Sequence, residues 1–293
     1  MNQKILTVGF PIYNGEKFLK RRLDNILTQS YNNFLIIISD NASTDKTEQI
    51  CKEYQKIDPR ITYVKQTKNL GGINNFLWLI NNSNTEYFVW AAADDIWSPD
   101  FLENNIKNLQ NNGDNVGSIG YVYYFDDERF SVDTFDKNNY TKQHVRSTDG
   151  TYEQRLQKYV NFNQTSALYS IFRTNILKKS VVQHAIVAWD TALIFRALKY
   201  GNFAVDQQSS MYRYSKGTAW DKESLSYKTS LSERKISFFE AMLTFLPFTI
   251  ISLKSLGIRI FLKNFEWFFL LNFRGERRFF KDLIKNLKEK LNK

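Results

Sequence analysis

The stretch that decides the fold is YFVWAAADDIWSP, residues 87–99. It begins as a run of aromatic and small apolar residues, which is the pattern of a strand buried on both faces of a sheet. Two carboxylates, Asp94 and Asp95, follow at once, and Ser98 and Pro99 then predict a helix start. A buried strand that ends in paired acids and leads into a helix indicates an α/β fold with a polar site at the strand end.

Other apolar runs alternate with amphipathic segments in the same way. The predicted strands are residues 5–11, 34–39, 61–65, 87–93 and 116–125, and the predicted helices are residues 15–30, 43–57, 72–82 and 98–112. This alternation predicts a doubly wound, mostly parallel sheet. Ligands bind at the carboxyl ends of the strands in such sheets, where Tyr13-Asn14, Asp40-Asn41 and Asp94-Asp95 fall. Residues 126–149 are polar and predict a long loop over this site, and Gly201 is expected to close a later helix.

The composition limits the class of protein and the kind of metal. With 293 residues, of which 43% are hydrophobic, the chain can bury the core of one large domain. Cys51 is the single cysteine, so no internal disulfide forms and a reducing compartment is expected. The N-terminus leads directly into the first predicted strand, so we expect no signal peptide. His144 and His184 are the two histidines, which disfavours zinc and favours a hard cation held by oxygen atoms.

The positive charge is concentrated near the C-terminus. Residues 252–293 contain eleven Lys or Arg and four Asp or Glu, so they contribute +7 of the formal net charge of +10. We expect an α/β domain over residues 1–223 and a helical, basic, amphipathic extension over residues 224–293. Such helices suit the surface of an anionic membrane, and the alternative is that they pack on the domain or on a second copy. Nucleic acid is not expected as a partner, because no nucleic-acid-binding motif accompanies the charge.

Five ordered segments resemble glycosyltransferase family 2, the inverting nucleotide-sugar enzymes with the GT-A fold. They are VGFPIYNGEKFLKRRLDNILTQSY (residues 8–31), FLIIISDNASTDKT (34–47), KNLGGINN (68–75), WAAADDIWSPDFLE (90–103) and WDTALIFRALKYG (189–201). The resemblance, to capsule- and lipopolysaccharide-type members, implies transfer of a sugar from a UDP- or dTDP-sugar to a hydroxyl of a cell-surface or lipid-linked glycan. It also implies a Mn²⁺ or Mg²⁺ cofactor. The basic amphipathic extension, together with a lipid-linked acceptor, predicts a peripheral location on the inner face of the cytoplasmic membrane.

The resemblance also assigns the nucleotide-sugar site. Its residues would be Pro11, Tyr13, Asn14, Asp40, Asn69, Gly71, Asp94 and Asp95. Asp40 would accept a hydrogen bond from the base, with Pro11 and Tyr13 lining that pocket, and a carboxylate in this role selects uracil or thymine. Asn69 and Gly71 would lie close to the nucleotide. The alternative for Asp40 is a turn-forming residue that bonds the backbone before Ser43.

Asp94 matches the second acid of the family's Asp-x-Asp motif and would ligate the metal, with Asp95 beside it orienting the site or contacting the sugar. A cation held there bridges carboxylate and phosphate oxygens and neutralises the leaving diphosphate. Ala92 stands where the first acid of the motif is expected, which puts the ribose contact in doubt. The alternative is that both acids only open a solvated turn.

Asp190 is the residue expected to act as the general base, because one carboxylate within reach of the acceptor hydroxyl can take its proton. The competing interpretation makes Asp190 the N-cap of a helix over residues 191–200, which would lower its pKa. SSMYRYSKGTAW (residues 209–220) resembles the family's Tyr-Arg turn without its usual histidine, and Arg213 or Lys216 could face the diphosphate.

Two other functions remain open from the sequence. A sugar nucleotidyltransferase would need a glycine-rich phosphate loop after the first strand, and PIYNGEKF (residues 11–18) contains a single glycine. A catalytically silent binding subunit of a membrane glycan-assembly complex would fit Ala92, but the presence of Asp94 and Asp190 counts against it.

Overall fold

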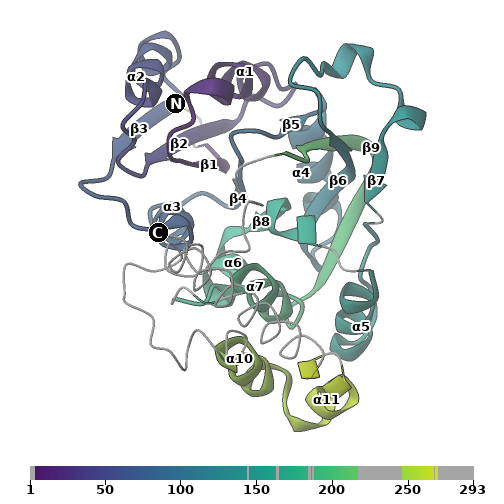
Figure 1. The fold of residues 1–293 in the computed structure, drawn as a ribbon. Coiled ribbons are helices and arrows are strands. Elements are labelled where there is room, and N and C mark those ends of the chain that lie inside the picture. The colour runs from purple at the N-terminus through teal and green to yellow at the C-terminus, as the bar shows by residue number, and fades with distance from the viewer. Residues whose placement is uncertain are drawn as a thin grey trace, which may run out of the picture.

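The computed structural model describes residues 4–143, 145–162, 165–183, 186, 188–216, 246–266 and 268–269. The strands are β1 (Leu6–Ile12), β2 (Phe34–Asp40), β3 (Ile61–Lys65), β4 (Tyr87–Trp90), β5 (Ile96–Trp97), β6 (Asn115–Phe125), β7 (Thr141–Gln143), β8 (Ile171–Arg173) and β9 (Asn202–Tyr214). They form one sheet in the order β3-β2-β1-β4-β8-β6-β9-β5, and β7 also pairs with β6 (Figure 1).

The sheet has two halves with different strand directions. β1 is parallel to both of its neighbours, β2 and β4, and β2 is parallel to β3. In the other half β8 runs antiparallel to β4 and β6, whereas β9 is parallel to β6. The α/β fold is confirmed, and the sheet is more mixed than expected. The difference arises from β5, β7 and β8, which are too short to show an apolar period, and from β9, whose middle is polar.

Helices cover both faces of the sheet and define two apolar cores. α1 (Glu16–Leu27), α2 (Thr47–Ile57) and α4 (Phe101–Asn111) pack on one face. α3 (Gly72–Asn81), α5 (Tyr152–Phe162), α6 (Thr174–Ser180), α7 (Trp189–Ala197) and α10 (Leu246–Leu256) contribute to the core of the other face. Apolar side chains on both faces of β1 and β4 explain why these strands read as continuous apolar runs in the sequence.

The stretch at residues 87–99 leaves the sheet and then returns to it. β4 ends at Trp90, and β5 pairs antiparallel with β9. The backbone N–H of Ser98 still donates to the carbonyl of Ser210 on β9, at 2.8 Å. The helix cap expected at Ser98 is therefore wrong, since α4 begins at Phe101 with Asp100 at the N-cap position.

The loop predicted over residues 126–149 is largely irregular, with two short 3₁₀ turns and β7 inside it. An aromatic cluster anchors it to the sheet, because Phe130 stacks on Phe125 at a centroid distance of 4.4 Å and contacts Tyr212 at 5.1 Å. Arg21 of α1 donates to the carbonyl of Glu128 at 2.7 Å. This hydrogen bond joins the loop to α1 beside the carboxyl ends of the strands.

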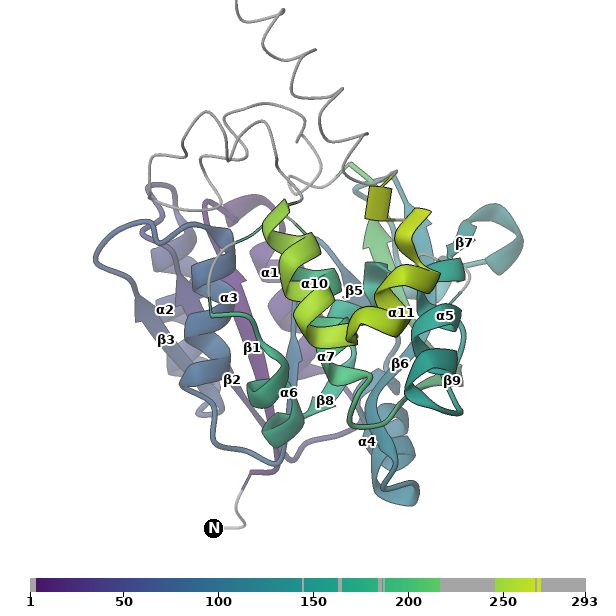
Figure 2. The same cartoon turned by 90° about the horizontal axis from the view of Figure 1, so that it is seen from below.

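The C-terminal extension packs on the α/β domain where the structure describes it. The expected boundary at residues 223 and 224 lies outside the described residues. α10 and the short α11 (Ile258–Lys263) lie on the outer side of α7 (Figure 2). Phe248 of α10 is fully buried and contacts Phe195 of α7 at a centroid distance of 5.9 Å. Across the described part of the chain, none of the helices has the length and apolar character to span a membrane.

Gly201 has a different role from the helix-closing one expected for it. α7 ends at Ala197, and the C-cap residue Leu198 has a right-handed conformation. Gly201 instead lies where the chain passes the backbone of Asp114, whose carbonyl accepts from Asn202 N–H at 2.8 Å. A Cβ atom at position 201 would lie 2.1 Å from that carbonyl oxygen. The glycine is therefore required by close packing of two backbone segments.

We predict that Gly201→Ala destabilises the fold by about 1–3 kcal/mol, because the added methyl group meets backbone that cannot move aside. Gly113→Ala is the matched control, since a Cβ atom there has nothing within 4 Å, and it should change stability by less than about 0.5 kcal/mol. Urea unfolding midpoints of the two variants measure the difference. Equal midpoints would show that the backbone relaxes around the methyl group.

Candidate functional site

The turns that follow β1 and β2 are joined by hydrogen bonds at the carboxyl edge of the sheet. Asn14 N–H donates to Ser43 Oγ at 2.9 Å, and Thr44 N–H donates to Asn14 Oδ1 at 2.9 Å. Gly15 N–H donates to Thr47 Oγ1, also at 2.9 Å. The structure therefore places the predicted residue Asn14 in the wall of the site, where its side chain connects the two turns.

A second set of hydrogen bonds adds the segment that precedes α3. Asn41 Nδ2 donates to Asn69 Oδ1 at 2.8 Å, and Leu70 N–H donates to Asn41 Oδ1 at 2.7 Å. Gly71 adopts a φ of 80°, a region that favours glycine, and its N–H also donates to Asn69 Oδ1. The predicted residues Asn69 and Gly71 thus lie beside the turn after β2.

Asp40 is fully buried, and both of its carboxylate oxygens accept hydrogen bonds within the protein. Ser43 N–H donates to Oδ1 at 2.8 Å, and the Tyr63 hydroxyl donates to Oδ2 at 2.6 Å. The alternative turn-forming role is therefore present in the structure, and a contact of Asp40 with a base stays a prediction. Tyr13 at the end of β1 is 50% exposed, and Pro11 is partly buried.

The paired acids after β4 have different surroundings. Asp94 is partly exposed, whereas Asp95 is 3% exposed and lies 3.6 Å from Arg213, measured from Oδ2 to Nε. Tyr214 N–H donates to Asp95 Oδ1 at 3.3 Å. Burial raises the pKa of Asp95 to about 6, although the Arg213 charge opposes this. Burial also raises the pKa of Asp94, and because Asp95 is almost completely buried the solvated-turn alternative does not describe Asp95.

A buried arginine supports the turn that carries the two acids. Arg22 of α1 is fully buried, its Nε donates to the Ala92 carbonyl at 3.0 Å, and its guanidinium lies 3.9 Å from the Trp97 ring centroid. Burial lowers the pKa of Arg22 to about 9, and the charges of Asp95 and Asp94 act in the opposite direction. Ala92 thus contributes its backbone carbonyl, not a side chain, to this part of the site.

Arg213 lies on the opposite side of the acid pair. It belongs to β9 and is 8% exposed, so the turn expected around it is a strand in the structure. Its Nη1 donates to Ser166 Oγ at 3.0 Å, and the guanidinium lies 4.9 Å from the Tyr169 ring centroid. Lys216, in contrast, is exposed and pairs with Asp126 at 3.3 Å.

Asp190 does not cap its helix. α7 begins at Trp189, and the N-cap residue is Ala188 with a φ of 58°, so the N-cap interpretation of Asp190 is wrong. Asp190 lies in the first turn, where Oδ1 accepts from Thr191 N–H at 2.8 Å. Burial raises its pKa, which is opposite to the lowering expected for a cap, and it makes Asp190 a stronger base.

The charge of Arg213, which contacts Asp95, also acts on the other two predicted carboxylates. The charge of Arg213 lowers the pKa of Asp94, Asp95 and Asp190, which opposes the effect of burial in each case. The hydroxyl of Tyr169 is affected by the same three carboxylates. Burial raises the pKa of Tyr169, and the charges of Asp95, Asp94 and Asp190 raise it further. Donor-side and acceptor-side candidates therefore share one electrostatic environment.

Backbone strain is concentrated at these positions. Among the described residues, positive φ angles outside glycine occur at Asn14, Ala42 and Ala188. Each lies within two residues of a predicted site residue. A left-handed conformation is unfavourable for alanine, and such strain persists where surrounding contacts impose it, often at functional sites.

Sequence reasoning missed Arg22, Tyr63, Ser166 and Tyr169. Arg22 had a usable signal, because it falls on the apolar face of α1 between Leu19, Leu23 and Ile26, where a charge requires a buried partner. The other three gave no signal, since tyrosine and serine are common on strands and turns. Five of the buried polar atoms that lack a hydrogen-bond partner in the described residues surround this region: Arg21 Nη2, Arg22 Nη2, Asp95 Oδ2, Trp97 Nε1 and Arg213 Nε.

The donor set at the acid pair fits a hard divalent cation. Asp94 offers a partly exposed carboxylate, whereas Asp95 Oδ2 is buried and faces Arg213 Nε at 3.6 Å, so Asp94 is the candidate ligand of the pair. Within the same residues there is no group of three or more His, Cys, Asp or Glu that could hold a metal ion. The remaining ligands would have to come from phosphate oxygens and water.

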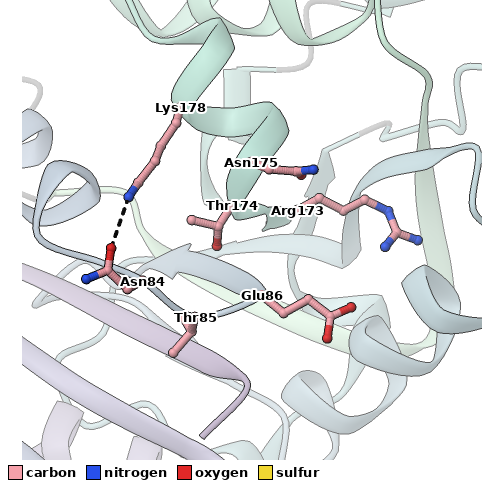
Figure 3. A pocket seen from close by; sticks show the side chains of 7 residues that line it. All are labelled: Asn84, Thr85, Glu86, Arg173, Thr174, Asn175 and Lys178. Carbon is pink, nitrogen blue, oxygen red and sulfur yellow. Dashed lines mark hydrogen bonds between the residues drawn. The ribbon is translucent and has the colours of Figure 1, made fainter.

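A separate pocket of about 400 Å³ lies away from these residues (Figure 3). Asn84, Thr85 and Glu86 line it before β4, and Arg173 and Thr174 line it at the end of β8. Lys178 in this pocket donates to Asn84 Oδ1 at 3.5 Å. Because this is the amino-terminal edge of β4, the pocket is on the opposite edge of the sheet from Asp94 and Asp95.

Comparison with known proteins places this geometry in a family. The profile of Glycosyl transferase family 2 matches residues 7–180. An uncharacterized glycosyltransferase of Methanocaldococcus jannaschii is 32% identical over 148 residues, 50% of this chain and 51% of that protein. The dTDP-rhamnosyl transferase RfbG of Shigella flexneri is 36% identical over 118 residues, 39% of this chain and 41% of that protein. The chain thus matches about half, or less, of the length of these relatives.

Solved structures share the fold at low sequence identity. S. aureus TarS in complex with UDP-GlcNAc matches with a TM-score of 0.60 and 16% identity, over 86% of this chain and 67% of that one. The mannosyltransferase PcManGT from Pyrobaculum calidifontis, in complex with GDP-Man and Mn²⁺, matches with a TM-score of 0.57 and 15% identity, over 97% and 75%. From its sequence match and its mixed α/β sheet, the chain belongs to glycosyl transferase family 2 and has the GT-A fold of these glycosyltransferases.

Proposed function

We propose that this protein is an inverting glycosyltransferase that moves a sugar from a UDP- or dTDP-sugar to a hydroxyl of a cell-surface or lipid-linked glycan. The observation that carries the proposal is the acid pair after β4, in which Asp94 is partly exposed and Asp95 lies 3.6 Å from the buried Arg213, whose charge also acts on the pKa of Asp190. The rhamnosyl transferase relative and the nucleotide-sugar complexes of the two structural neighbours support a nucleotide-sugar donor. We place the protein at the inner face of the cytoplasmic membrane.

Each group then has a defined task. The joined turns after β1, β2 and β3 form the nucleotide side, with Tyr13 exposed for stacking on a base. Asp94 would hold Mn²⁺ or Mg²⁺, which when bound supplies positive charge for the leaving diphosphate. Arg213 holds Asp95 in place from the buried side. Asp190 takes the proton of the acceptor hydroxyl, because burial raises its pKa and makes it a stronger base.

The two rival functions find less support. A sugar nucleotidyltransferase would cradle phosphates in a glycine-rich turn, and the turn after β1 is instead filled by the Asn14 side chain. A silent binding subunit would not need both the acid pair and Asp190, whose pKa is raised by burial.

Asp94→Asn tests the donor side. We expect Mn²⁺-dependent binding of UDP or dTDP to weaken by about tenfold or more, because the cation loses its charged ligand; tenfold corresponds to about 1.4 kcal/mol. Calorimetry with UDP, dTDP, GDP and CDP, with and without Mn²⁺, measures this. Asp133→Asn, an exposed carboxylate on the loop after β6, is the matched control. Unchanged metal-dependent binding in Asp94→Asn would remove Asp94 from the metal site.

Asp190→Asn tests the acceptor side. Loss of the general base should lower kcat by about 10²–10⁴-fold while binding of the donor nucleotide stays unchanged, because Asn keeps the shape but cannot accept the proton. Single-turnover transfer and calorimetry on the same preparation separate the two effects. Retained turnover would assign the proton transfer to another group.

The pH dependence of kcat provides a further prediction. Tyr159, Tyr169 and Arg213 are the titratable or charged groups whose interaction with Asp190 changes a pKa. A base must be ionised, so a raised pKa moves the acid limb of the kcat profile above pH about 4, the region of an ordinary carboxyl. Arg213→Gln removes the cation that lowers this pKa and should move the limb to still higher pH. Arg129→Gln, an exposed arginine paired with Asp127, should leave the limb in place, and an identical shift in both variants would contradict the assignment.

A further inference from the structure

α11 and the residues after it carry apolar side chains on two sides. On the inner side Phe261 is 8% exposed and Phe268 is 2% exposed, and their rings stack at a centroid distance of 4.7 Å. Phe268 also contacts Phe248 of α10 at 5.9 Å. This inner side packs on the α/β domain. The alternative that the extension packs on the domain therefore applies to this side of it.

The outer side is exposed. Ile258, Leu262, Phe265 and Phe269 are exposed by 63%, 60%, 52% and 57%. Ile258 and Leu262 are four residues apart on α11 and so lie on the same side of that helix, which ends at Lys263. Phe265 and Phe269 lie beyond this end, and their rings stack at a centroid distance of 6.2 Å. We call these four residues the outer stripe. Exposed large apolar side chains that gather in this way can mark an interaction site.

The charges beside the outer stripe indicate its partner. Lys254 and Arg259 are exposed on α10 and α11, and Lys263 is exposed and pairs with Glu153 of α5. In the described residues 252–266 and 268–269 these three basic side chains are accompanied by one acid, Glu266, and in sequence the whole of residues 252–293 carries +7. An apolar row with basic neighbours is the pattern of a helix that lies in the interface of an anionic bilayer. Phenylalanine is also common at protein interfaces, so the basic neighbours, and not the apolar side chains alone, favour a lipid surface.

We propose that the outer stripe inserts into the interfacial region of an anionic lipid bilayer, with α11 parallel to the membrane surface. The proposal rests on the membrane location proposed above, and it names the surface through which the protein would bind the membrane. The inner side fixes α11 to α7 through Phe248 and Phe195, so the catalytic domain is held at the membrane in one orientation. A lipid-linked acceptor would then meet the domain from a constant side.

Sedimentation of the full-length protein with vesicles tests the proposal. The wild type should bind phosphatidylcholine vesicles that contain phosphatidylglycerol, and binding should weaken in high salt and on pure phosphatidylcholine. Leu262→Ser combined with Phe265→Ser should lower the partition coefficient at least about tenfold, because less apolar area is buried in the bilayer. Both side chains are exposed, so the melting temperature should not change.

Ile57→Ser is the matched control, because Ile57 is 75% exposed at the end of α2, on the other face of the sheet. It should bind vesicles as the wild type does. Wild-type binding in the double variant would overturn the role of the stripe and leave the membrane location intact. If the wild type does not bind vesicles and is a dimer, and the double variant is a monomer, the stripe would instead be an interface with a second copy of the chain. Nucleotide binding, measured in parallel, reports separately on the glycosyltransferase proposal.

Discussion

The ion pair between Arg213 and Asp95 is the interaction on which the rest of the site depends. Both side chains are almost completely buried, at 8% and 3% exposure. Removing one member of such a pair leaves an uncompensated charge and costs about 3–5 kcal/mol. The pair also joins β9 to the turn after β4 and so connects the mixed half of the sheet to the parallel half. The position of Asp94 follows from this connection, because it is the neighbouring residue.

Charge balance explains why a buried strand leads directly into two acids. Arg22 contacts the turn from α1 and Arg213 contacts it from β9, so the acid pair lies between two buried cations. Burial nevertheless raises the pKa of both carboxyls, so desolvation outweighs attraction by the arginines. The result is a compact group of opposite charges in which each member limits the movement of the others.

The parallel half of the sheet and the polar turns at its carboxyl edge could be predicted from the sequence, and the remainder could not for physical reasons. Residues 5–11, 34–39 and 87–93 reveal strands because both of their faces are covered, and the polar residues after them mark the strand ends. β8 has three residues, and β9 is polar in its middle, so neither produces a period. Ser98 has the local sequence pattern of a helix cap. It pairs with β9 instead, and a local pattern cannot reveal this pairing because Ser210 is far away in the sequence. The partner of Arg213 is likewise fixed only by the tertiary fold.

The hydrogen bonds among the turns after β1, β2 and β3 have a thermodynamic consequence. Asn14, Asn41 and Asn69 connect these turns through hydrogen bonds within the protein, and Asn14 and Ala42 have left-handed backbone conformations. The conformational entropy of these loops is therefore lost when the chain folds. If a nucleotide donor binds there, as we propose, it has little further ordering to impose, so more of its contact energy would contribute to affinity. The folded protein would then have lost, as lower stability, much of the entropy that binding otherwise costs.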